Sequence, residues 1–437
     1  MFEEPAFDFA DAFAGIGGFH AALSSLGGRC IWASEIDETA ARVYARNWGM
    51  MPTGDIRPQT EGKKVSVPGH DIFAGGFPCQ PFSKSGFQRG MSETRGTLFW
   101  NILRVLEDRR PAVVVLENVR NLAGPRQRET WETIVRSLRD LGYRVSSEPS
   151  VFSPHLLPPE AGGAPQVRER VFITGTHVGR KVARQAADLP PLLTPTPLPG
   201  WNPLDWRIDD YLDDDETISS LHRYELSNDE VAMIEIWNEF IGVVDRGRPL
   251  PGFPIWADAL TYPAVIPANT PAWKANFLRK NADLFRRNER AITRWFDKHE
   301  GLQHLAPSRR KLEWQAQDTE RNLWNCVLHF RPSGIRAKRP TYLPALVAIT
   351  QTSIIGPRRR RITPREAARL QGLPEWFDFN GQREAESYKQ LGNGVNVGVV
   401  QHVLRSHAER DANDLPEHIV SALLKPPVEL SNPTMRD

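Results

Sequence analysis

The chain has 437 residues, of which 40% are hydrophobic and 25% are charged, and its formal net charge at pH 7 is +2. A composition this close to that of an ordinary globular protein excludes a wholly disordered, collagen-like or repeat-dominated chain. The length exceeds that of one average domain, so we expect two or three units. A net charge so near zero does not by itself argue for a nucleic acid as partner.

The sequence contains no stretch close to the roughly 20 apolar residues that a membrane span needs. Its start, MFEEPAFDF, lacks the basic and then apolar layout of a secretory signal, so we expect the protein to stay in the cytoplasm. Cys30, Cys79 and Cys326 stand far apart without paired Cys or His, which predicts neither a disulfide framework nor a metal site.

Residues 7–176 alternate short apolar runs with amphipathic stretches, which predicts βαβ units around a parallel sheet, a fold of the α/β class. In chain order, the expected elements are strands 7–12, 29–34, 70–75, 112–117 and 170–175 and helices 18–27, 37–47, 97–109 and 129–141. Helical apolar spacing returns at 362–372 and 395–404 and suits helices packed on an existing domain.

A proline-dense segment, LPPLLTPTPLPGWNP at 189–203, disfavours both helix and central strand and predicts a domain boundary. Most of the 13 tryptophans lie in 201–330, together with the basic stretch 274–298. Such aromatic density predicts a folded module, in which tryptophans more often anchor a core than stack on bases.

The first motif, DAFAGIGGF at 11–19, lies between an expected strand and an expected helix. Gly15 and Gly17 permit a tight turn there and let a ligand approach backbone N–H groups at the helix start. A dinucleotide fingerprint would need a third glycine where His20 stands, which disfavours an NAD enzyme.

Two acids, Glu35 in SEID and Asp55 in GDI, are placed by the sequence pattern at strand ends. By analogy with the acidic residue of Rossmann domains, they suit the ribose hydroxyls and the amino group of an adenosine-type ligand. A solvated surface acid is the alternative for each of them.

The sharpest motif is GGFPCQPFS at 75–83, which places Cys79 between two prolines at the carboxyl end of an expected strand. Ligands and catalytic groups of open α/β sheets gather at that edge. Because the prolines hold the backbone in a fixed turn, we interpret Cys79 as a nucleophile rather than as a buried small hydrophobe.

Charged residues lie at the end of one further expected strand and at the start of another. Glu117 follows the run VVVL, where burial would raise its pKa and make it a proton donor, unless it simply reaches solvent. Arg168 and Arg170 in QVRER share one face of an expected strand, which suits an anionic or carbonyl-bearing substrate, or else a solvated face.

A run of four arginines at 358–361 leads into a helix start with Thr363 as N-cap and Pro364 at the first helical position. From the sequence alone, the run either holds phosphate or keeps a loop solvated.

Taken in this order, the segments resemble the DNA (cytosine-5)-methyltransferase family of bacterial type II restriction-modification systems. DAFAGIGGF is similar to the family's S-adenosylmethionine loop, GGFPCQPFS to its Pro-Cys motif, LENV to its glutamate motif and QVRER to its Gln-x-Arg-x-Arg motif. RRITPREAARLQGLP and QLGNGVNV resemble its two C-terminal motifs. The likeness covers 7–176 and about 358–407, and the tetrapeptide of the competing amino-methyltransferases does not occur.

The resemblance implies a Rossmann-like, S-adenosylmethionine-dependent methyltransferase domain with a smaller target-recognition domain inserted. It implies catalytic segments at 1–185 and 385–437, and target recognition with a hinge at 186–384. The implied reaction methylates carbon 5 of a flipped cytosine in double-stranded DNA through a Cys79 adduct. Glu117 would act on N3 and the amine, and Arg170, with Arg168, would hold the O2 carbonyl.

The cofactor contacts that the resemblance implies are Phe13, Gly15, Gly17, Glu35, Ile36, Asp55, Ile56, Pro78, Leu98, Asn393 and Val395. The expected DNA contacts are Gln80, Ser83, Arg95 and Gln166, and a loop at 83–96 is expected to close over the flipped base. Gly394 departs from the family, which usually has serine after this asparagine, and so removes one hydroxyl contact to the cofactor.

Two alternatives remain at this point, a tRNA cytosine-5 methyltransferase on the same scaffold and a DNA-binding module that has lost catalysis. The large tryptophan-rich insertion favours DNA over tRNA, and the intact catalytic motifs argue against a silent module. We expect a monomer that protects host DNA from a restriction endonuclease acting at the same site, without a stable complex between the two proteins.

Overall fold

The computed structural model describes residues 4–78, 97–185, 189–192, 197–317, 320–346 and 352–432. Among these, 4–206 and 367–432 form one compact unit, unit 1, and 207–346 with 352–366 form a second, unit 2. Unit 1 is therefore discontinuous in sequence, and unit 2 is inserted into it. These divisions differ from the boundaries expected after 185 and after 384.

Unit 1 is built on one sheet with the strand order β2-β1-β3-β4-β7-β5, in which β6 also pairs with β7. The strands are β1 Phe7–Ala12, β2 Gly28–Ser34, β3 Ile72–Gly76, β4 Val113–Val119, β5 Tyr143–Val145, β6 Ser150–Phe152 and β7 Arg170–His177. β1 to β4 pair in parallel, as predicted, whereas β7 runs antiparallel to β4, β5 and β6. The expectation of a wholly parallel sheet is therefore wrong at 170–175.

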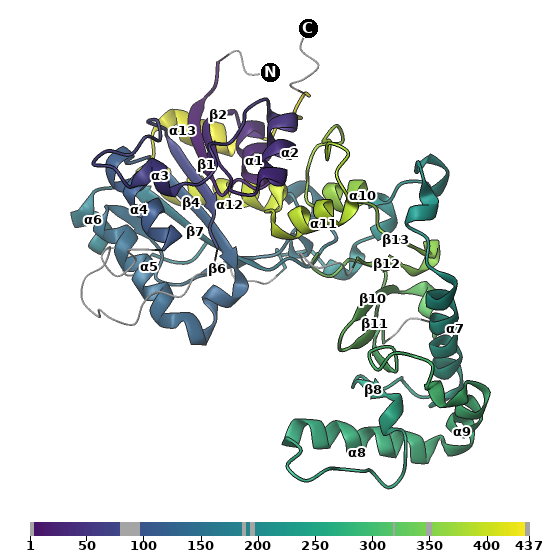
Figure 1. Ribbon diagram of the computed structural model, residues 1–437. Helices are drawn as coiled ribbons and strands as arrows, with labels where there is room; N and C mark the ends of the chain where they lie inside the picture. The colour runs from purple at the N-terminus through teal and green to yellow at the C-terminus, as the bar shows by residue number, and fades with distance from the viewer. Residues whose placement is uncertain are drawn as a thin grey trace. The chain divides into compact units, whose positions relative to one another are not determined.

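Helices cover this sheet and bring the two ends of the chain together. They are α1 Gly18–Ser25, α2 Glu38–Trp48, α3 Arg57–Thr60, α4 Leu98–Arg109, α5 Arg128–Asp140, α6 Arg180–Gln185, α10 Pro364–Leu370, α11 Glu384–Asn393, α12 Val397–Asp411 and α13 Glu417–Leu424. Apolar residues of α4 and α5 pack on β3 and β4 in one core. Figure 1 shows the C-terminal α12 and α13, in yellow, beside the purple β1, β2 and α1.

Local sequence explains where α2 begins and ends. The Asp37 carboxylate accepts hydrogen bonds from the backbone N–H groups of Thr39 and Ala40, at 3.0 and 3.2 Å, and so caps the first turn. Gly49 ends the helix in the left-handed conformation, with φ of 69°. The helix thus runs between two strong boundary signals.

Unit 2 contains a six-stranded sheet of order β13-β12-β10-β11-β9-β8. Its strands and helices are β8 Ile255–Trp256, β9 Lys311–Gln315, β10 Val327–Arg331, β11 Gly334–Lys338, β12 Ile354–Ile355, β13 Arg360–Arg361, α7 Asn228–Val243, α8 Ala272–Arg287 and α9 Glu289–Lys298. Its core includes Trp237, Trp295, Trp314 and Trp324, whereas Trp273 is 61% exposed. The prediction that most of these tryptophans are core residues is confirmed.

Arg360 is the most buried residue of the arginine run 358–361. It has neither of the two roles that the sequence left open for the run, which were to hold phosphate or to keep a loop solvated. Arg360 is 1% exposed and makes ion pairs with Glu366 and Asp215, each at 2.7 Å. Thr363 Oγ1 accepts from the backbone N–H of Glu366 at 3.1 Å, and the Glu366 carboxylate accepts from the N–H of Thr363 at 2.7 Å. The predicted N-cap is confirmed, and Arg360 is a structural residue of unit 2.

Over the residues that the structure describes, no helix is both long and apolar enough to cross a membrane. The same described ranges hold no cluster of three or more His, Cys, Asp or Glu side chains suited to a metal ion.

Candidate active site

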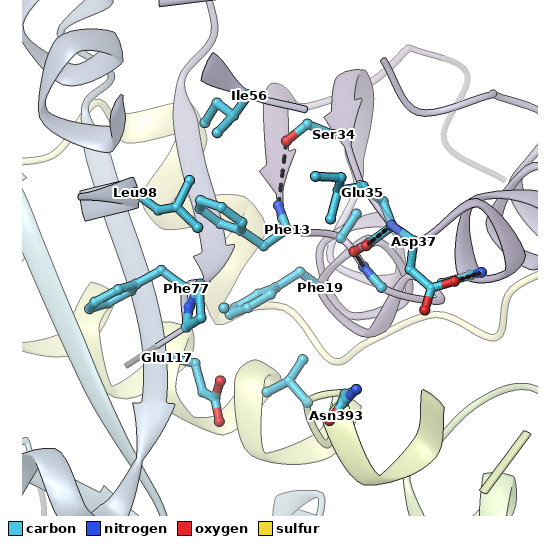
Figure 2. Close-up of a pocket in the computed structure, with 18 of the residues that line it drawn as sticks. Phe13, Phe19, Ser34, Glu35, Asp37, Ile56, Phe77, Leu98, Glu117 and Asn393 are labelled. Atoms are coloured by element: carbon cyan, nitrogen blue, oxygen red, sulfur yellow. Dashed lines mark hydrogen bonds between the residues drawn. The ribbon is translucent and has the colours of Figure 1, made fainter. Parts of the chain in front are cut away.

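A cavity of about 600 Å³ opens in unit 1 at the sheet edge where β1 to β4 end. Its walls come from the segments that follow these strands, from the start of β7, and from the turn after α11. Figure 2 shows Phe13, Glu35, Phe77, Glu117 and Asn393 converging on it from five separate parts of the chain. This is the edge at which open α/β sheets bind ligands.

All but one of the predicted cofactor residues line this cavity. Those that do are Phe13, Gly15, Glu35, Ile36, Asp55, Ile56, Pro78, Leu98, Asn393 and Val395. Gly17 lies behind it, with φ of 95°, and a Cβ there would overlap the Trp48 ring. Gly17 is therefore required for the shape of the loop rather than for lining the cavity.

The loop after β1 is held in a strained path by specific hydrogen bonds. Phe13 and Gly15 have φ of 57° and 56°, in the left-handed region. The backbone N–H of Gly15 donates to Glu35 Oε2 at 2.8 Å, and that of Asp37 donates to Glu35 Oε1 at 2.7 Å. Glu35 thus holds the loop after β1 with Oε2 and the start of α2 with Oε1, and the remaining lone pairs of both oxygens can accept further bonds.

Asp55 lies in the segment between α2 and α3 rather than at a strand end. The guanidinium of Arg57 donates to Asp55 Oδ2 from Nε at 2.7 Å and from Nη2 at 2.5 Å, and the Arg57 backbone N–H donates to Oδ1 at 2.9 Å. These hydrogen bonds hold the pKa of Asp55 below its ordinary value. Asp55 is therefore an oriented, ionised acceptor on the cavity wall.

Three phenylalanines give the cavity an apolar interior, and sequence reasoning identified only one of them. Phe13 was predicted, whereas Phe19 and Phe77 were not. Figure 2 shows all three rings beside the cavity. Phe19 and Phe77 belong to the two glycine-containing motifs, so their positions within those motifs could have indicated them.

Glu117 and Arg170 form a buried ion pair at one end of the cavity, with Arg170 Nε 2.8 Å from Glu117 Oε1. Burial raises the pKa of Glu117 above its ordinary value, although Arg170 and Arg168 act in the opposite direction. A carboxyl group with a raised pKa keeps its proton to higher pH than an ordinary glutamate and can act as a proton donor, and the adjacent guanidinium can bind a carbonyl oxygen. The prediction that Glu117 simply reaches solvent is thereby excluded.

The ends of β3 and β4 are fixed side by side next to this pair. Gly76 is the register partner of Glu117, and Asn118 Nδ2 donates to the Phe77 carbonyl at 2.8 Å. Pro78 lines the cavity, and Cys79 follows it in the sequence. Cys79, Gln80, Ser83 and Arg95 lie outside the described residues.

The structure separates the two arginines that the sequence pattern had paired. β7 begins at Arg170, so Arg168 is not on that strand and the alternation argument does not apply. Arg168 is 1% exposed, does not line the cavity, and donates from Nη2 to the carbonyls of Gly392, at 2.9 Å, and Gly394. Direct contact of Arg168 with a substrate carbonyl is therefore not supported.

Gln166 also has a different place from the one expected. Its side chain is fully buried, and its Oε1 accepts from Gln371 Nε2 at 2.7 Å. A side chain without exposed surface cannot contact DNA, so we withdraw this residue from the expected DNA contacts.

The model of the C-5 cytosine-specific DNA methylase family matches residues 7–409. Type II methyltransferase M.AluI of Cellulosimicrobium cellulans is 47% identical over 93% of this chain and 92% of its own length. Type II methyltransferase M.BanI of Aneurinibacillus aneurinilyticus is 30% identical over 93% of this chain and 97% of its own length. A putative DNA modification methyltransferase of an E. coli prophage aligns over 92% of this chain and 98% of that chain, with 19% identity and a TM-score of 0.46.

Proposed function

This chain belongs to the family of C-5 cytosine-specific DNA methylases and is a DNA (cytosine-5-)-methyltransferase of the type II class, and we propose how its own residues carry out the reaction. The methyl group comes from a bound donor, for which we propose S-adenosylmethionine. The alternative of a tRNA cytosine-5 methyltransferase is not favoured by these relatives.

The chemistry of the cavity fits this donor. Asp55 offers an acceptor for the adenine amino group, Glu35 offers lone pairs to the ribose hydroxyls, and Phe13 offers an apolar ring face. When bound, S-adenosylmethionine supplies an electrophilic methyl group. The aromatic interior suits a sulfonium cation, which is attracted to ring faces.

Carbon 5 of cytosine is a poor nucleophile until a group adds at carbon 6. We propose that the Cys79 thiolate forms that bond, because Cys79 follows directly on the segment that ends beside Glu117. Glu117 protonates or hydrogen-bonds N3 as sulfur adds, and Arg170 holds the O2 carbonyl. After methylation, a base removes the proton of carbon 5 and the bond between sulfur and carbon 6 breaks, which releases Cys79.

A cytosine stacked in a duplex does not expose carbon 6, so the base must leave the helix at a cost of a few kcal/mol. We propose that residues 83–96 close over the flipped base, and that Gln80, Ser83 and Arg95 contact the DNA. The single observation that carries the proposal is the Glu117–Arg170 pair, buried at the sheet edge that also presents the donor residues.

We propose that unit 2 is the target-recognition unit. Arginine, asparagine and glutamine side chains in this region can read base edges in the major groove. On α8, Lys274, Arg279 and Lys280 are exposed, and none of them is paired with a carboxylate of the described residues. Such unpaired cations suit contacts with DNA phosphates.

We further propose that the protein acts as a monomer in the cytoplasm and protects host DNA from a restriction endonuclease with the same target. One recognition unit and one donor-binding cavity suffice for this task.

The proposed adduct can be trapped. Random-sequence duplexes carrying 5-fluorocytosine in place of cytosine are incubated with the protein and S-adenosylmethionine, because fluorine at carbon 5 blocks the release of Cys79. We expect a protein–DNA complex that survives denaturing electrophoresis with the wild-type protein and not with Cys79→Ala. The sequences of the trapped duplexes would identify the target.

A parallel reaction with transcripts that carry 5-fluorocytidine tests the tRNA alternative. Trapping of RNA alone would contradict the DNA assignment. Absence of any complex, with a protein that binds S-adenosylmethionine and DNA, would contradict the covalent mechanism.

A further inference from the structure

Arg168 is a fully buried cation whose partners are backbone carbonyls rather than carboxylates. Its Nη2 donates to Gly392 O and Gly394 O, residues more than 220 positions away in the chain. Over the described residues, its Nε and Nη1 have no hydrogen-bond partner. A buried charge is costly unless it is compensated, so this placement calls for an explanation.

The two carbonyls belong to the C-terminal end of α11, which finishes at Asn393 with Gly394 as its cap. The last carbonyls of a helix lack partners within it, and they carry the negative end of the helix dipole. A guanidinium at this position satisfies these carbonyls, and their negative charge offsets part of the cost of burial, which lowers the pKa of Arg168 to about 9. Arg168 therefore fixes where α11 ends and where the following turn begins.

That turn is one wall of the cavity. Gly392, Asn393, Gly394 and Val395 all line it, and Figure 2 shows Asn393 facing the interior. The same turn also contacts the start of α1, where the backbone of Val395 lies so close to Gly18 that a Cβ on Gly18 would stand 2.7 Å from Val395 O. The wall is thus clamped between Arg168 and the start of α1, and a shift of either would change the shape of the donor site.

We infer that Arg168 is a positioning residue for the methyl donor: by holding the carbonyls of Gly392 and Gly394, it sets the wall formed by residues 392–395 and hence the affinity for S-adenosylmethionine. It does so without touching the cytosine. This inference rests on the proposed function, since it assumes that the donor occupies this cavity. It replaces the direct role at the O2 carbonyl that the sequence motif had suggested for Arg168.

The test compares Arg168→Lys with the wild-type protein. Lysine keeps the charge but presents a single ammonium group, which does not reproduce the planar geometry of a guanidinium. Arg144→Lys is the matched control, because Arg144 is also largely buried in unit 1, pairs with Asp411 at 3.2 Å and Asp414 at 2.8 Å, and does not line the cavity. Thermal unfolding of all three proteins checks that they fold.

The measured quantities are the dissociation constants for S-adenosylmethionine without DNA and for DNA without donor, and then the steady-state constants. For Arg168→Lys, we expect donor binding to weaken about tenfold, equivalent to about 1.4 kcal/mol. DNA affinity should remain within about twofold, and kcat at saturating donor should be retained while the donor KM rises. Arg144→Lys should leave both affinities unchanged.

An unchanged donor affinity together with a lower kcat would show that Arg168 acts on the cytosine, and would overturn the inference. An unchanged donor affinity with only a lower unfolding temperature would overturn it as well. If the wild-type protein itself fails to bind S-adenosylmethionine, the proposed donor is wrong and the inference falls with it.

Discussion

The carboxyl group of Glu117 follows four apolar residues of β4 and is 7% exposed, so its protonation is governed by burial. Burial raises its pKa, and Arg170 at 2.8 Å limits that rise. An acid and a cation placed together in this way can supply a proton to one atom of a ring and a hydrogen bond to another. At the residue scale, this pair is the chemical centre of the site.

Replacing Glu117 by Gln should lower the rate of methyl transfer about 10²-fold or more, because the amide cannot transfer a proton. Since the pKa of Glu117 is raised, its protonated form persists to higher pH than that of an ordinary glutamate. If Glu117 acts as the acid, the single-turnover rate of the wild-type protein falls as pH rises through that pKa. The rate of Glu117→Gln should not show this decrease with pH. Glu107→Gln, at a surface pair with Arg104, is the control. A rate within threefold of wild type would contradict the assignment.

Substitutions at two glycines of the cavity wall, Gly18 and Gly394, give a second test of the donor site. A Cβ on Gly18 would stand 2.7 Å from Val395 O, a backbone atom that cannot move aside cheaply, whereas a Cβ on Gly394 would stand 3.4 Å from its nearest neighbour, Gln390 O. We expect Gly18→Ala to weaken donor binding about tenfold or more. Gly394→Ala should change it less than threefold. The reverse order, measured by calorimetric titration, would contradict the wall geometry.

At the scale of elements, α10 begins at a dense set of polar contacts. The Glu366 side chain is fully buried, and its carboxylate accepts hydrogen bonds from two nitrogens of Arg360, at 2.7 and 3.0 Å. The same carboxylate accepts a hydrogen bond from the backbone N–H of Thr363. Arg360 has a second carboxylate partner in Asp215, at 2.7 Å, and the loss of either partner leaves a buried cation only partly compensated, which is destabilising.

Because Arg360 keeps its ion pair with Asp215, Glu366→Gln should lower the free energy of unfolding of unit 2 by about 1 to 3 kcal/mol. Asp258→Asn, which removes a half-exposed partner of Arg310, should cost about 1 kcal/mol or less. Urea unfolding followed by tryptophan fluorescence measures both, because the core of unit 2 contains Trp237, Trp295, Trp314 and Trp324. Equal losses in the two variants would show that the Arg360–Glu366 pair is not a principal support of unit 2.

The elements that the sequence predicted well are those with long apolar runs. β1 matches the expected strand at both ends, and β2, β3, β4 and α4 match within two residues. β5 and β6 have three residues each, too few for a period to show, and so they were missed. Because they pair with β7, missing them also hid the antiparallel direction of β7.

The residues of the candidate site were likewise predicted best where the signal is local in the sequence. Most of the predicted cavity residues belong to glycine and proline motifs, which restrict the backbone locally, although Phe19 and Phe77 of the same motifs were missed. The positions of Arg168 and Gln166 were misread, because their partners Gly392 and Gln371 lie more than 200 positions away. No local pattern reports such contacts.

At the scale of the whole molecule, unit 1 needs both ends of the chain. Thr176 Oγ1 on β7 donates to Asp411 Oδ2 at 2.6 Å and lies 3.0 Å from His407 Nε2 on α12, and all three side chains are buried. Val395 and Asn393, which precede α12, complete the cavity. The two ends of the chain are thus both needed to build the unit that contains the cavity.

The affinity for DNA should depend on the exposed Lys and Arg side chains of α8 in unit 2. Lys274→Ala and Arg279→Ala, made singly, should each weaken binding similarly on all sequences and lower the slope of log affinity against log salt by about 1. Lys298→Ala is the control, because Lys298 is paired with Glu239 at 2.8 Å. An unchanged slope in both variants would place the phosphate contacts on another surface.

The central claim is methylation of carbon 5 of cytosine in DNA by a Cys79-dependent reaction. The most direct measurement is bisulfite sequencing of genomic DNA from a host without cytosine-5 methylation that expresses the wild-type chain, beside the same host expressing Cys79→Ala. We predict cytosines that resist conversion at one short recurrent sequence with the wild-type chain, and complete conversion with Cys79→Ala. Complete conversion with a folded, donor-binding wild-type protein, or protection that persists in Cys79→Ala, would contradict the account.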